Sequence, residues 1–292
     1  MTSETAVPVS LAEIARIAGV GRAAVSNWRR RHESFPERIG GTDASPQFSL
    51  AEVVRWLREN GKLKDAGTRE LLWPRFEALG SRDATGAAIA EVARQMRGGP
   101  SHTAGTESHT AGTEPAGLSE CTRELIAEAV RLGQREGEKE VFDFLLQRWL
   151  DAHVRQLSTT PVPLADLMAR TALRIAAPRL AGEQAEGTGP KGTGSGRAAG
   201  TRPYSGAAGT DGPVAGHVLT VLDPACGTGR LLAAAVKAYD RGPLVLLGCD
   251  RDPTVAALAG ARLGFLADRA FADGGPAIEA GIRQGDSLRA DP

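Results

Sequence analysis

The chain of 292 residues has little cysteine, no excess of either charge and no long hydrophobic run. Its cysteines, Cys121, Cys226 and Cys249, show no CxxC spacing, as expected in a reducing compartment without structural zinc. Lys+Arg and Asp+Glu both number 35, so net charge indicates no partner. No apolar stretch approaches the ~20 residues that span a bilayer, and no signal peptide is recognisable. We expect a cytoplasmic protein with no metal and no membrane partner.

Two segments have almost no apolar residues at helical or strand spacing. Residues 99–117 contain the tandem copy SHTAGTESHTAGTE, and residues 181–216 are rich in Gly, Ala, Thr and Pro. Because such segments have little to bury, we expect a disordered repeat linker and a flexible insertion. Ordered structure is then expected at 8–98, 118–180 and 217–292.

The first ordered piece predicts two short helices joined by a glycine turn. Ser10 and Glu13 have the spacing of a capping box before LAEIARI. The turn AGVG leads into a second helix over Arg22 to Arg31. A small hairpin is expected between residues 38 and 48, followed by a helix that Ser49 caps.

This order resembles the winged helix-turn-helix of phage excisionases and MerR-like regulators over residues 8–64, followed by a helical extension at 65–98. The resemblance implies double-stranded DNA as a partner, because such a second helix lies in the major groove. Val25 and Trp28 are expected to point inward. The predicted DNA-binding residues are Arg22, Ser26, Asn27, Arg29 and Arg30. The alternative is a small three-helix domain with a basic exposed face.

Within a helical region expected at 118–180, residues 119–157 have apolar side chains at helical spacing, which favours packing over cofactor binding. Near the end of this region, Thr160 and Pro161 precede an apolar helix expected over Leu164 to Leu173. A proline presets the start of such a helix.

The segment LDPACGTGRLL, Leu222 to Leu232, follows an apolar run and precedes a helical one. It predicts a corner between a buried strand, His217 to Leu222, and a helix, Arg230 to Tyr239, where ligands of open α/β folds bind. Gly227 and Gly229 let the main chain approach a ligand, and Asp223 can accept hydrogen bonds from a cationic group. A GxGxxG dinucleotide motif fits less well, because Leu232 replaces its third glycine. A P-loop fits worse still, because no GK[ST] follows.

Two further acidic residues stand at expected strand ends. The strand LVLLGCD ends at Asp250, suited to hold two ribose hydroxyls, and a helix is expected over 253–263. The segment IRQGDSL, residues 282–288, offers a third strand tip with Asp286, suited to accept from an adenine amine. Three strands that each end in Asp at one edge are a far more specific signal than a glycine pair.

These motifs resemble the first three motifs of class I S-adenosylmethionine-dependent methyltransferases. The segment DPACGTG resembles the form of the first motif in N-6 adenine DNA methylases, especially type I restriction modification subunits and phage-defence methylases. The resemblance covers about residues 119–292 and implies an α/β fold with a Rossmann-like sheet behind a mostly helical N-terminal region. It implies S-adenosylmethionine as cofactor, with its methionine end near Asp223 and below the Thr160 segment. Arg230 departs from the family, which more often has a small residue there. The cofactor-binding residues implied are Thr160, Pro161, Asp223, Ala225, Gly227, Gly229, Asp250 and Asp286.

The family's catalytic (D/N/S)PP(Y/F) tetrapeptide is absent from residues 1–292. We therefore expect the front part of an adenine N-6 DNA methyltransferase, with the first strands of its sheet at 217–292 and no catalytic residue. A specificity or restriction subunit is a further expected partner. The alternative is a non-catalytic helix-turn-helix regulator with a degenerate methylase fold. A methylase of RNA or of a glutamine side chain is a weaker third hypothesis.

Overall fold

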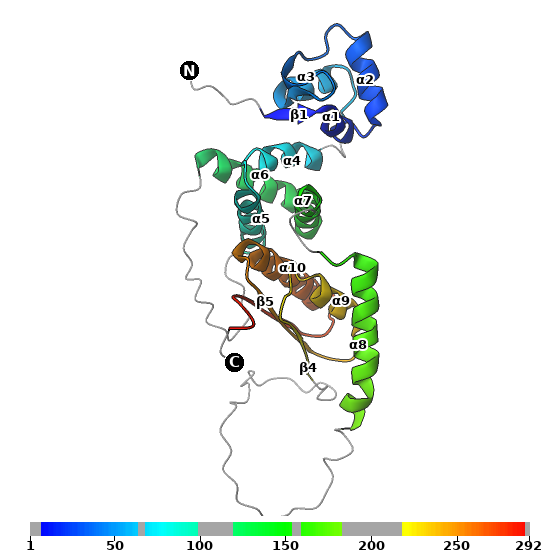
Figure 1. Cartoon of the computed structure of the whole chain (residues 1–292), viewed down its shortest axis with the longest axis vertical. Coiled ribbons are helices and arrows are strands. Elements are labelled where there is room, and N and C mark those ends of the chain that lie inside the picture. Colours follow the sequence, from blue (N-terminus) through cyan, green and yellow to red (C-terminus); the bar gives the residue numbers. More distant parts are fainter. Residues whose placement is uncertain (1–6, 64–67, 99–118, 154–158, 183–217, 290–292) are drawn as a thin grey trace, which may run out of the picture.

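The computed structural model describes residues 7–63, 68–98, 119–153, 159–182 and 218–289. This part of the chain is α/β and mostly helical, with ten helices and two three-stranded sheets. Figure 1 shows an N-terminal unit at one end, a helical bundle in the middle and a parallel sheet with its helices beyond it. The expected linker and nearly all of the expected flexible insertion lie outside the described residues.

The N-terminal unit combines three helices with an antiparallel sheet of order β1-β3-β2. The hairpin β2–β3 is confirmed, with Gly41 opposite Pro46. Strand β1 was not predicted; its three residues pair with β3, Val9 opposite Phe48, a tertiary contact that no local pattern specifies. The elements are β1 (Pro8–Ser10), α1 (Leu11–Ile17), α2 (Arg22–Arg31), β2 (Arg38–Gly41), β3 (Pro46–Ser49) and α3 (Leu50–Glu59).

The two serines expected to cap helices behave differently. At α1 the capping box is confirmed: the Ser10 hydroxyl accepts from Glu13 N at 3.4 Å, and the Glu13 carboxylate accepts from Ser10 N at 2.7 Å. Ser49 is the N-cap residue of α3, but its side chain makes no capping bond, so that expectation was wrong. The neighbouring β1 segment supplies an acceptor instead, because Leu50 N donates to Val7 O at 2.9 Å.

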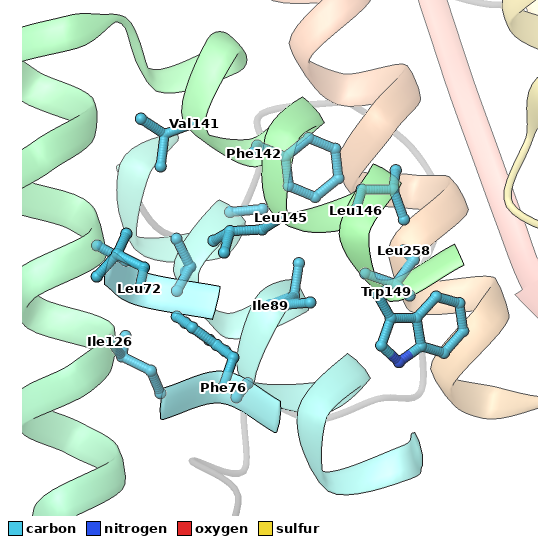
Figure 2. Packing of buried hydrophobic residues seen from close by; sticks show 14 of the residues in the cluster. Leu72, Phe76, Ile89, Ile126, Val141, Phe142, Leu145, Leu146, Trp149 and Leu258 are labelled. Carbon is cyan, nitrogen blue, oxygen red and sulfur yellow. The ribbon is translucent and has the colours of Figure 1, made fainter. Parts of the chain in front are cut away.

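The bundle consists of α4 (Thr68–Glu77), α5 (Arg82–Met96), α6 (Glu120–Glu136) and α7 (Glu138–Ala152). Its buried side chains form one cluster that includes Leu258 from the sheet unit, as Figure 2 shows. Helix α5 packs closely on α10 (Pro253–Ala272) of the sheet unit at Gly86. A Cβ atom added there would lie only 2.3 Å from Cγ2 of Thr254. The packing role predicted for residues 119–157 is therefore confirmed for 119–153, the part that the structure describes.

The C-terminal unit is a parallel sheet of order β4-β5-β6, with Leu219 opposite Leu244 and Leu244 opposite Ile278. Helices α9 and α10 connect successive strands and pack on one face of the sheet through Leu232 and Leu263. The elements are α8 (Val162–Gly182), β4 (Leu219–Asp223), α9 (Arg230–Ala238), β5 (Leu244–Asp250), α10 (Pro253–Ala272) and β6 (Ile278–Gln284).

Several boundaries differ from the sequence expectation, most of all those of α8, α10 and β6. Helix α8 is twice as long as predicted and runs to Gly182; it buries Ala165 and Ala169 against α9, while Leu167 is 55% exposed. Helix α10 continues to Ala272 because Leu263 and Phe265 extend its buried face. Strand β6 ends at Gln284, two residues before Asp286, which was predicted at the strand tip. Among the described residues, no helix is long and apolar enough to cross a membrane.

Candidate ligand site at the edge of the parallel sheet

The three predicted carboxylates lie at one edge of the sheet. Asp223 is the last residue of β4 and Asp250 the last of β5, while Asp286 follows β6 by two residues. The strands are parallel and in register, with Asp250 opposite Gln284. Their carboxyl ends therefore meet at the edge where open α/β sheets bind ligands.

Asp223 has an unsatisfied acceptor. Its Oδ1 accepts from Ala225 N at 3.1 Å, whereas its Oδ2 is buried without a hydrogen-bond partner. A buried carboxylate oxygen without a donor costs free energy, and a donor or cation beside it removes that cost. Ala225 itself is exposed.

Asp250 stabilises the corner loop, the segment 224–229 between β4 and α9, a role that the sequence did not indicate. Its Oδ2 accepts from Gly227 N at 2.9 Å, and its Oδ1 accepts from Asp252 N at 3.0 Å. Because each carboxylate oxygen has two lone pairs, acceptor capacity remains for ligand hydroxyls.

The two glycines of the loop serve different purposes. Gly227 has φ +54°, and a Cβ added there would meet nothing within 4 Å, so the main chain borders open space. Gly229 has φ +71°, and its Cβ would lie 3.4 Å from Ala259 of α10. Gly227 fits the predicted approach of a ligand, whereas the close neighbour of Gly229 is a helix.

Asp286 is already engaged by protein groups. Its Oδ1 accepts from Leu288 N at 3.1 Å. Its Oδ2 lies 3.8 Å from Arg251 Nε and 3.7 Å from Arg289 Nε. Both arginine side chains are more than four-fifths exposed, so these ion pairs are screened by solvent.

Two arginines bind the backbone around the loop. Arg230, the first residue of α9, donates from Nη1 to Thr160 O at 2.8 Å. Arg262 of α10 donates from Nη1 to Thr228 O at 2.7 Å and to Thr228 Oγ1 at 3.1 Å. Burial, and then the nearby Arg230, lower the pKa of Arg262 to about 10, so it remains a cation at neutral pH. Arg262 was missed because it lies in the helix and not in a motif.

Cys226 is a structural part of the loop. Its amide donates to Cys249 O at 2.9 Å, and the side chain is buried. Burial, and then Asp223 and Asp250, raise the pKa of its thiol to about 12. The thiol is therefore protonated at neutral pH and is no nucleophile.

The predicted DNA-binding residues lie together on α2. Arg22, Asn27, Arg29 and Arg30 are exposed, and Ser26 is half-buried. The Arg30 guanidinium donates to Asn27 Oδ1 at 2.6 Å. The Arg29 guanidinium lies 5.9 Å from the ring centre of Phe48 in β3, a contact that sequence spacing did not reveal.

A separate cavity of about 520 Å³ lies between the N-terminal unit and the bundle. It contains none of the predicted site residues, and Glu13, Glu77 and Arg148 are among its lining residues. Burial, and then Glu13, raise the pKa of Glu77 to about 6. Its mixture of both charges indicates no ligand class, so the sheet edge remains the candidate site.

Comparison of the chain with protein-family models, with curated proteins and with solved structures gives no match. Among the described residues, no group of three or more His, Cys, Asp or Glu side chains is placed to hold a metal ion.

Proposed function

We propose that this chain binds S-adenosylmethionine at the carboxyl edge of the sheet and belongs to an adenine N-6 DNA methyltransferase of the restriction-modification or phage-defence type. The observation that carries the proposal is the unpaired, buried Oδ2 of Asp223, beside Asp250 and the open space at Gly227. The β4-α9-β5-α10-β6 order with its parallel strands supports a Rossmann-like fold for this unit.

Charge favours a cationic ligand over a dinucleotide. Dinucleotide sites place a pyrophosphate at the helix N-terminus after the first strand, and a carboxylate there repels it. Here Asp223 and Asp250 flank the loop, and Leu232, where a third glycine would stand, is fully buried. S-adenosylmethionine carries an ammonium and a sulfonium, which suit an unpaired carboxylate oxygen.

Each site residue then has a defined task. Asp223 accepts from the amino-acid end of the cofactor, Asp250 uses its remaining lone pairs for the ribose hydroxyls, and Asp286 faces the adenine ring. The glycine at 227 leaves room for the ligand beside the main chain. When bound, the cofactor supplies an electrophilic methyl group. The tetrapeptide that holds the target adenine in the family is absent from the 292 residues, so no residue here is assigned to that step.

The N-terminal unit supports the DNA part of the proposal. Its order of two helices, a hairpin and a third helix agrees with a winged helix-turn-helix, in which α2 is the recognition helix. The arginines at positions 22, 29 and 30 are exposed there and suit phosphates and guanine edges.

Isothermal titration calorimetry with S-adenosylmethionine tests the proposal. Replacing Asp250→Ala removes the ribose acceptor and a loop contact, so affinity is expected to fall at least about tenfold, or about 1.4 kcal/mol. Asp240→Ala removes an equal charge from an exposed position between α9 and β5, at the other edge of the sheet, and should leave affinity unchanged. The absence of any heat of binding with the unmodified chain would contradict the proposal.

A second candidate is a non-catalytic DNA-binding regulator whose methylase-like unit serves packing or ligand sensing. The exposed arginines of α2 favour it, because they suit DNA binding whether or not the sheet edge takes a cofactor. Salt-dependent binding to duplex DNA by a chain that has no affinity for S-adenosylmethionine would select this candidate.

A further inference from the structure

Arg230 joins two segments that are 70 residues apart in the sequence. Arg230 begins α9 directly after the loop, and its guanidinium binds Thr160 O, just before α8. From α10, Arg262 binds Thr228 of the same loop. Thr228 and Arg230 are thus bound to α10 and to the residue two before the start of α8, respectively.

Leu173 of α8 packs against the buried cluster of the sheet, and Leu231 and Ala238 are partly buried in the contact between α8 and α9. The buried residues of that contact are Ala165, Ala169 and Ala234, whose small side chains provide close approach but little interlocking. A charged donor on a single backbone carbonyl is directional, so Arg230 selects one placement of the Thr160 segment.

We infer that Arg230 is a positioning residue that holds the Thr160–Pro161 segment beside the loop and thereby adapts the site to the amino-acid end of the cofactor. This inference rests on the proposed function. Within that function the ligand runs along the sheet edge from Asp223 to Asp286. The Thr160 segment is attached at the β4 side through α9, so it borders the end nearest Asp223 and not the adenine.

The experiment compares two ligands that differ only at that end. S-adenosylhomocysteine carries the amino acid, whereas 5′-methylthioadenosine keeps the nucleoside and thioether without it. Arg230→Met keeps an unbranched side chain over the arginine stem and removes the guanidinium donors. We expect about tenfold weaker binding of S-adenosylhomocysteine and a change within about twofold for methylthioadenosine. Arg230→Lys, which keeps one charged donor, should recover part of the loss.

A ligand-free measurement accompanies the titration. Amide hydrogen exchange of Ala165, whose amide donates to Pro161 O, should accelerate in Arg230→Met because the start of α8 loosens. Arg241→Met is the control, since Arg241 is exposed near the start of β5, at the opposite edge of the sheet. It should alter neither exchange nor binding.

The two readouts separate the possible failures. Unchanged exchange in Arg230→Met overturns the contact itself. Faster exchange with equal losses for both ligands, or with no loss, overturns the positioning role. If the unmodified chain binds neither ligand, the proposed function fails and the positioning role fails with it, whatever the exchange result.

Discussion

Single residues of the corner loop and of the strand end before it differ from the same residues in water in their pKa, hydrogen bonding or backbone conformation. The Cys226 thiol has its pKa raised to about 12, and Asp223 keeps an unpaired carboxylate oxygen. Gly227 and Gly229 both have positive φ, which other residues rarely adopt. A loop with these properties is preorganised before any ligand arrives.

The reactivity of the cysteines reports this state. Because a pKa of about 12 leaves roughly one thiolate in ten thousand at pH 8, Cys226 should resist alkylation in the folded chain. Exposed Cys121 should react under the same conditions. Iodoacetamide labelling followed by mass spectrometry measures both, with urea-unfolded protein as the control. Rapid labelling of Cys226 without denaturant would contradict the burial of the loop.

At the scale of elements, the starts of α1 and α3 show that a serine at the N-cap position does not by itself predict a capping hydrogen bond. Ser10 and Ser49 both occupy N-cap positions, yet only Ser10 makes the capping bond. The amide at the start of α3 donates to Val7 O instead, which depends on strand β1.

The two serines form a matched pair for measurement. Ser10→Ala should lower the free energy of unfolding by about 1 kcal/mol, because it removes a capping acceptor. Ser49→Ala should cost only a few tenths of a kcal/mol, since no capping bond is lost. Urea unfolding of both variants gives the comparison. Equal losses would show that the capping geometry at α1 does not decide its stability.

At the scale of the whole molecule, the bundle connects the N-terminal unit to the sheet. Arg82 of α5 pairs with Asp252, the N-cap of α10, and Arg97 pairs with Asp268 at 2.6 Å. Trp149 Nε1 donates to Arg82 O at 3.0 Å. The bundle therefore holds Asp252, which lies two residues after Asp250. Helix α2 lies at the far end of the molecule from the sheet (Figure 1).

This separation predicts that DNA affinity can be altered without changing the ligand site. Arg29→Ala with Arg30→Ala should weaken duplex DNA binding and reduce the salt slope by about two, since two phosphate contacts are lost. Arg123→Ala with Arg131→Ala removes equal charge from exposed positions of α6 and is the control. Fluorescence anisotropy at several salt concentrations measures both. An unchanged slope in the α2 variant would argue against α2 as the DNA-binding helix.

Local sequence patterns were sufficient to predict several helices and strands of this protein. Spacing and capping residues placed α2 over Arg22–Arg31 and β5 over Leu244–Asp250 as the structure has them. The positions of Asp223 and Asp250 at strand ends followed directly, because apolar runs bounded by turn residues mark where a strand stops.

Only the tertiary structure decided the rest, because it depends on residues far apart in the sequence. Strand β1 exists through its pairing with β3, and α8 begins where Arg230 binds the carbonyl before it. The bond from Gly227 to Asp250, the ion pairs of Asp286 with Arg251 and Arg289, and the bonds of the buried Arg262 to Thr228 are not specified by any local pattern. The sequence by itself determined which groups stand at the sheet edge, whereas folding determined which of them remain unpaired, because hydrogen-bond satisfaction is a property of the packed chain.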